Sequence, residues 1–126
     1  MRIHRLPRRF VSPAFLVLTA ALLACPGCET PGPQRLPEVY DQHDAGAYSS
    51  CCDLASKIAD ATTGVAGDEA AYMAGACCGK AGRPADAERH LLRATRSSDS
   101  RLAGQAMAEL GLLYLRAGQE ARAASM

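Results

Sequence analysis

Six cysteines are the residues of this 126-residue chain whose type and spacing most directly suggest chemistry. Two adjacent pairs, Cys51-Cys52 and Cys77-Cys78, lie in the middle of the chain, and Cys25 and Cys28 lie near its start. Cysteine pairs form disulfide bonds in oxidising compartments, and two pairs together can bind a zinc ion tetrahedrally. Zinc sites usually have two residues between the cysteines of a pair, a spacing that the adjacent pairs lack. Disulfides, a less favoured metal site and small buried thiols are therefore all open interpretations.

The rest of the chain gives no catalytic set. Cys25 and Cys28 have the spacing of a redox motif, but no alternating strand-and-helix pattern surrounds them. The segment 74–81 resembles a phosphate-binding loop but lacks its first glycine and its final Ser or Thr. His43 and His90 have no ligand partner four residues away, and we expect both to be exposed polar residues. The sequence predicts no enzymatic activity and no cofactor.

Residues 1–24 have the layout of a secretory signal. Four arginines precede an apolar run from residue 10 to residue 24, which is short for a membrane span. The run ends in Leu22-Leu23-Ala24-Cys25, which resembles the cleavage site of a bacterial lipoprotein. The resemblance implies removal of a signal peptide 1–24 and attachment of acyl chains to the thiol of Cys25. It also implies a membrane-anchored location in the bacterial cell envelope, facing the periplasm or the exterior. Simple secretion and an uncleaved anchor are the alternatives.

The segment 25–36 contains several prolines and glycines, and it predicts a flexible tether. The 14 basic residues less the four arginines of the signal peptide leave 10 against 13 acidic residues, a net charge of −3. This balance argues against nucleic-acid binding. It also means that membrane contact would rest on the acyl chains of Cys25, of which stable attachment needs more than one.

Residues 37–126 are the predicted folded domain, because their apolar and small residues recur at the three- and four-residue spacings of helices. Gly64 and Gly67 are expected to end a helix, Asp68 to cap the next one, and Ser98-Asp99-Ser100 to supply a further cap. The predicted helices are about 37–44, 47–63, 68–79, 84–97, 100–117 and 119–125. No segment shows the alternation of a strand, so the predicted class is all-α.

Three Ala-Gly steps, which end in Gly46, Gly82 and Gly118, recur with a period of 36 residues. A period in this range is typical of stacked helical repeats. The units resemble tetratricopeptide repeats, in which a Leu-Gly-x-x-Tyr element, a glycine turn and spaced alanines follow one another. The matching residues are Leu110, Gly111, Tyr114, Gly118 and Ala123 in the last unit, Ala74, Gly75, Cys78, Gly82, Ala87, Leu91 and Ala94 in the middle unit, and Gly46, Tyr48, Ala55 and Ile58 in the first.

The resemblance implies a short α-solenoid of about two and a half antiparallel helix pairs. Helices approach closely only where small residues meet, so Gly75 and Gly111 are expected to face Ala87 and Ala123. The period is two residues longer than the usual 34, which places the extra residues in the turn between units. The last unit has a short second helix, with no polar capping helix after it.

In the register of these repeats, the two cysteine pairs lie where neighbouring antiparallel helices meet. Cys51 opens the second helix of one unit, and Cys78 closes the first helix of the next. A cross-link between the Cys51/Cys52 pair and the Cys77/Cys78 pair is therefore expected. Adjacent residues of a helix point about 100° apart, so Cys51–Cys78 and Cys52–Cys77 are not both expected to close.

As the resemblance implies, repeats of this kind scaffold complexes by binding a peptide or a helix of another protein. The candidate partner surface consists of non-core positions on the first helices: Tyr72, Met73, Lys80, Gln105, Glu109 and Leu112. Leu113, Leu115 and Ala121, on the open C-terminal end, form a second candidate surface for a partner or for a second copy in a homo-oligomer. The expected function is an envelope scaffold that binds another envelope protein, and the alternative is a cysteine-based metal-binding or redox module.

Overall fold

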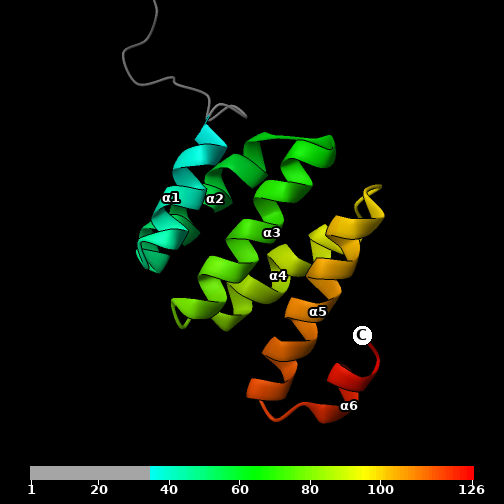
Figure 1. Ribbon diagram of the computed structural model, residues 1–126. Coiled ribbons are helices and arrows are strands. Elements are labelled where there is room, and N and C mark those ends of the chain that lie inside the picture. Colours follow the sequence, from blue (N-terminus) through cyan, green and yellow to red (C-terminus); the bar gives the residue numbers. More distant parts are fainter. Residues whose placement is uncertain (1–34) are drawn as a thin grey trace, which may run out of the picture.

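The computed structural model describes residues 35–126 of the chain. The predicted signal peptide, Cys25, Cys28 and the tether as far as residue 34 lie outside the described residues. The described part contains six helices and no strand, which confirms the all-α class (Figure 1): α1 (Leu36–Asp44), α2 (Tyr48–Ala61), α3 (Gly64–Lys80), α4 (Pro84–Ala94), α5 (Ser100–Arg116) and α6 (Glu120–Ala124). None of these helices is both long and apolar enough to cross a membrane.

The glycines of the 36-residue period occupy one structural position in each unit. Gly46, Gly82 and Gly118 follow α1, α3 and α5 and adopt φ angles of 75°, 76° and 69°, a conformation that glycine adopts without strain. The residue after each glycine donates its backbone N–H to a carbonyl five residues earlier, as in the bond of 2.9 Å from Arg83 to Cys78. This is the helix C-cap in which a left-handed glycine satisfies the last carbonyls. The sequence period is therefore a period of helix-ending turns.

The N-terminus of α5 follows the sequence, whereas that of α3 does not. The Asp99 carboxylate accepts hydrogen bonds from the backbone N–H groups of Arg101 and Leu102 at 2.9 and 3.2 Å, which confirms the predicted cap. The expectation that Gly67 ends a helix and that Asp68 caps the next one is wrong, because α3 already begins at Gly64.

Gly67 has a packing role inside α3. A side chain at this position would collide with the backbone carbonyl of Thr62, beyond the end of α2. The glycine thus lets the first turn of α3 pass directly beside the end of α2. Asp68, one residue further on, pairs with Arg93 of α4 at 3.4 Å.

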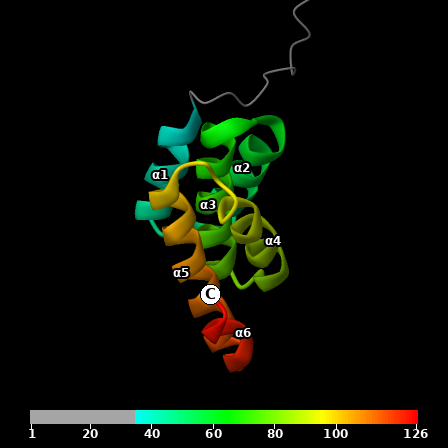
Figure 2. The ribbon, with the colours of Figure 1, turned by 90° about the vertical axis from the view of Figure 1, so that its right-hand side faces the viewer.

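The helices pack in chain order, and α3 is the central one (Figure 1). It contacts α2 and α4 along its length, and it also touches α1 and α5. After a 90° turn, the far ends of α5 and α6 project beyond α3 and α4 (Figure 2). The core is made mainly of alanine and cysteine, with a few larger side chains: Val39, Ile58, Met73, Leu91, Leu102, Leu110 and Tyr114.

Close approach of α3 and α4 depends on Gly75. A Cβ at this position would lie 3.3 Å from the carbonyl oxygen of Ala87 and 2.7 Å from Cδ2 of Leu91. The corresponding Gly111 of α5 faces α6 in the same way, with a looser 4.0 Å to the carbonyl oxygen of Ala123. The two contacts are one repeat apart and match the register drawn from the sequence.

Gly75→Ala should destabilise the fold, because the added methyl group overlaps Leu91 in a packed interface. We expect the free energy of unfolding to fall by about 1–3 kcal/mol. Gly79→Ala is the matched control on the same helix, because its Cβ would meet Ala87 at 3.8 Å, an ordinary contact. It should leave stability unchanged or raise it by up to about 1 kcal/mol through helix propensity. Denaturant unfolding of both variants with the disulfides intact measures the difference, and equal effects would contradict the packing.

Candidate functional site

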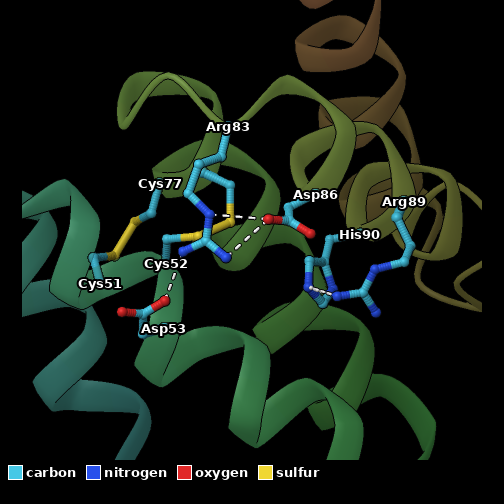
Figure 3. The surroundings of a disulfide bond; sticks show 9 residues. Cys51, Cys52, Asp53, Cys77, Arg83, Asp86, Arg89 and His90 are labelled. Atoms are coloured by element: carbon cyan, nitrogen blue, oxygen red, sulfur yellow. Dashed lines mark hydrogen bonds and ion pairs between the residues drawn. A yellow bond between two sulfur atoms is a disulfide. The ribbon is translucent and has the colours of Figure 1, made fainter.

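The four central cysteines form two disulfide bonds between α2 and α3 (Figure 3). Cys51 is bonded to Cys77 and Cys52 to Cys78, with Cα–Cα distances of 5.8 and 4.8 Å. All four residues are fully buried. The bonds join the first turn of α2 to the last turn of α3 and so fix two helices that follow each other in the chain.

The connectivity differs from the two pairings considered from the sequence, Cys51–Cys78 and Cys52–Cys77. Successive residues turn by about 100° around a helix. When two antiparallel helices are viewed along one direction, successive residues rotate clockwise around one helix and anticlockwise around the other. The first cysteine of each pair therefore falls on one side of the line of contact, and the second cysteine falls on the other. The offset that was expected to prevent two bonds instead allows two bonds to form side by side.

Charged residues surround the disulfides on the exterior. Arg83, in the turn before α4, binds Asp53 of α2 at 2.6 Å and Asp86 of α4 at 2.8 Å (Figure 3). Hydrogen bonds to Asp53 and then to Asp86 raise the pKa of Arg83 above its usual value.

Arg93 acts at the other end of α2. It donates to the backbone carbonyls of Ala59 and Thr62, and so satisfies carbonyls that the helix leaves unpaired.

A cysteine metal site needs free thiolates, and a redox module needs a sulfur that an exchanging thiol can reach. A sulfur that is bonded to another sulfur is no thiolate ligand, and the buried bonds present no surface to an exchanging thiol. Among residues 35–126, no group of three or more His, Cys, Asp or Glu side chains is arranged to hold a metal ion.

The expectation of two exposed histidines is wrong for His90. This residue is 2 % exposed, because it lies with Ala87, Leu91 and Ala94 on the buried face of α4. Burial lowers its pKa, and the neighbouring Arg89, whose Nη2 lies 2.9 Å from Nε2, lowers it further. His43 is partly exposed and accepts a hydrogen bond from Lys80 at 2.8 Å.

The first candidate surface is formed by the first helix of each pair, and we call it the inner face: Tyr40, Val65, Glu69, Tyr72, Arg101 and Gln105 of α1, α3 and α5, with the neighbouring Glu109. All of them except Glu109 line a small hollow of about 60 Å³, to which Asp99 and Leu102 also contribute. The Tyr40 hydroxyl donates to Glu69 at 2.6 Å and so joins α1 to α3. Burial, and then this hydrogen bond, raise the pKa of Tyr40 to about 12. Burial and the charge of Glu109 raise the pKa of Tyr72.

The predicted partner residues do not all lie together. Tyr72, Gln105 and Glu109 lie at the inner face. Met73 is wrong as a surface residue, because it is 5 % exposed and belongs to the core. Lys80 lies beside His43 and above the ring of Tyr48, at the other end of α3.

Leu112 and Leu113 do not line the hollow of the inner face. Leu112 is exposed on α5 three residues beyond Glu109. Leu113, predicted for the open C-terminal surface, instead packs against the core near Gly79. Tyr40, Val65, Glu69 and Arg101 were not predicted from the sequence as members of this surface. Tyr40 directly follows Val39, which is buried. Adjacent helix residues point in different directions, so an aromatic residue next to a core aliphatic residue could have indicated an exposed tyrosine.

The second surface is an apolar groove of about 490 Å³ on α5 and α6, which we call the C-terminal groove: Gly104, Met107, Ala108, Gly111, Leu112, Leu115, Ala123 and Met126. Its α5 members are three or four residues apart and form one stripe along the helix. Leu112 and Leu115 are 45 % and 54 % exposed.

Two double variants test the disulfide connectivity. In Cys51→Ala/Cys77→Ala, the remaining Cys52 and Cys78 should stay bonded. In Cys51→Ala/Cys78→Ala, the remaining Cys52 and Cys77 lie on opposite sides of the helix contact and should stay reduced. Thiol titration of the unfolded, unreduced proteins should find two more free thiols in the second variant, and equal counts would contradict the connectivity.

The same variants test the contribution of the bonds to stability. Each bond closes a loop with a sequence separation of 26 residues, and such a loop stabilises a fold by about 3.5 kcal/mol on the chain-entropy model. Because both bonds close nearly the same loop, removing one should cost much less than removing both. Chemical unfolding of the single-bond and bond-free proteins measures the two steps.

Comparisons with protein-family models, with curated proteins and with solved structures find no match to this chain. The disulfide-linked core, the inner face and the C-terminal groove are thus the features of residues 35–126 that bear on function.

Proposed function

We propose that this chain is a lipid-anchored scaffold or adaptor of the bacterial cell envelope, which binds another protein through the inner face of a tetratricopeptide-like solenoid. The observation that carries the proposal is the hollow that spans three helices, with half-exposed tyrosines beside carboxylates. Tyrosine offers a large contact area together with a polar tip, and it is enriched where proteins bind one another.

Repeated geometry supports a solenoid. The helix-ending turns at Gly46, Gly82 and Gly118 share one backbone conformation, and the glycine contacts at Gly75 and Gly111 are one repeat apart. The first helices of successive units also touch, because α3 contacts both α1 and α5. Neighbour-to-neighbour stacking of this kind produces the extended binding surfaces of repeat proteins.

The chemistry of the inner face selects the class of partner. Glu69 and Glu109 add negative charge beside Tyr40 and Tyr72, and Arg101 is the one basic side chain that lines the hollow. Complementary charge steers and orients a partner more than it adds affinity. The partner that fits is a protein segment that presents apolar side chains together with Lys or Arg.

Two features support the envelope location. The sequence Leu22-Leu23-Ala24-Cys25 follows an apolar run, as in lipoprotein signals. Two disulfide bonds in a small domain are typical of compartments outside the reducing cytosol. Acyl chains on Cys25 would hold the helical domain at the membrane through the Pro- and Gly-rich segment that follows.

Metabolic labelling with palmitate in a bacterial host tests the anchor. The unaltered chain should incorporate label and fractionate with membranes, whereas Cys25→Ser should lose the label because the acylated thiol is gone. Cys28→Ser is the matched control and should remain labelled. Label that persists in Cys25→Ser, or that never appears in the unaltered chain, would contradict lipidation.

A photo-cross-linking residue at Gln105 tests the inner face in living cells. It should capture a protein that the same residue at Lys57, exposed on α2, does not capture. Tyr72→Ala should then weaken binding of the purified partner by about tenfold or more, as truncation of a central interface tyrosine does. Leu92→Ala, an exposed position on α4, should leave the dissociation constant unchanged. Equal capture at both positions, or a dissociation constant that Tyr72→Ala does not change, would refute the inner face as the binding site.

A further inference from the structure

We propose that the C-terminal groove binds a second copy of this chain, so that two α5 helices pack antiparallel in a symmetric dimer. This inference goes beyond the proposed function, because it concerns another surface and stands without the lipid anchor. It rests on the pattern of α5, on how the preceding repeat is covered, and on the polarity of the opposite end.

One position equivalent to a groove residue is covered one repeat earlier. Gly79 of α3 lies 36 residues before Leu115 of the groove. Leu113 of α5 covers Gly79, with 4.0 Å between its Cδ1 and a Cβ built on that glycine. Tyr114 of α5 also donates a hydrogen bond of 2.9 Å to Glu88 of α4. The chain therefore covers this position with α5, and a second copy can supply a helix that covers Leu115.

The stripe on α5 is complementary to itself when the helix direction is reversed. Consider two antiparallel α5 helices related by a two-fold axis. A residue of one copy then lies level with the residue of the second copy for which the two residue numbers add up to about 219 or 220. Leu115 then lies over Gly104 of the second copy, and Leu112 lies over Ala108 of the second copy. Each of these two leucines meets a small residue, which is the condition for close helix packing. The same operation acts on both copies, so every contact forms twice.

The edges of the stripe also match. Met107 comes level with Leu112 of the second copy, so two apolar side chains meet there, and Met126 lies 3.8 Å from the position of a Cβ on Gly111. Arg101 extends the stripe toward the start of α5. The antiparallel alignment places it near Glu120 of the second copy, which follows the end of α5, so opposite charges meet at both ends.

Polarity favours this two-fold contact over head-to-tail stacking. Helix α1 exposes Glu38, Asp41 and Asp44 at the other end of the array. Docking these carboxylates on Leu112 and Leu115 would remove them from water without a partner, at a cost of several kcal/mol for each ion. The apolar end therefore fits its own copy better than it fits the opposite end.

Sedimentation equilibrium of the full chain in density-matched detergent tests the dimer. The unaltered chain should be dimeric, and Leu112→Glu or Leu115→Glu should raise the dimer dissociation constant by at least about 100-fold, because each buries two unpaired carboxylates. Leu92→Glu is the matched control on α4 and should remain dimeric. A monomeric unaltered chain, or a dimer that Leu112→Glu and Leu115→Glu leave intact, would overturn the proposal, and the latter result would assign association to another segment. Far-UV circular dichroism should be unchanged in all variants, because the substituted side chains are exposed.

A cysteine cross-link tests the orientation. Ala108 lies close to the proposed two-fold axis, so mild oxidation of Ala108→Cys in the full chain should join the introduced thiols of the two copies. Mass mapping reads the bond from the peptide 102–116, which holds no other cysteine. Ala85→Cys, exposed at the start of α4, should give no bond between copies. A dimer in which Ala108→Cys never forms the bond, or in which Ala85→Cys forms one equally well, would overturn the antiparallel arrangement.

Discussion

The contact between α2 and α3 is the constraint on which the rest of the structure depends. Its buried side chains are mostly alanine and cysteine, with Ile58 as the largest of those that α2 contributes. Each buried methylene stabilises a fold by only about 0.8 kcal/mol, so an alanine-rich interface gains little from hydrophobic burial. Two covalent bonds across this contact make up for the small side chains. They also fix α3, the helix against which α1, α4 and α5 pack.

The means of holding helices together change along the chain. Disulfides join α2 to α3, and close packing at Gly75 with the hydrogen bonds of Arg93 joins α4 to them. The contact of α5 with α6 is looser, and it is held partly by Arg122, which lies over the ring of Tyr114 and binds Glu88. Hydrogen bonds from Tyr114 and then from Arg122 lower the pKa of Glu88 below its usual value. Surfaces for partners are therefore more readily available at α5 and α6 than at the cross-linked core.

The sequence predicted features that depend on local backbone chemistry. Glycine at Gly82 and a carboxylate at Asp99 act within a few residues, so the turns, the cap and the order of helices could be read directly. Features that depend on neighbouring helices could not. His90 is buried because α4 turns that face toward α3, and Gly67 lies inside a helix because α2 ends beside it. Cysteine connectivity required the sense of rotation of two facing helices, which the spacing alone does not provide.

The two proposed surfaces have a geometric relation that bears on function. Gln105 and Glu109 lie on the side of α5 next to Leu112, so the inner face adjoins the C-terminal groove. A two-fold axis perpendicular to an antiparallel helix pair keeps equivalent sides together. Both inner faces of the proposed dimer would therefore open on one side, with their hollows beside each other. Once one segment of a partner is bound, a second suitable segment would meet the second hollow at a high effective concentration, which strengthens binding overall. If Cys25 is acylated, the two chains of the dimer would also be held at the membrane more firmly than one.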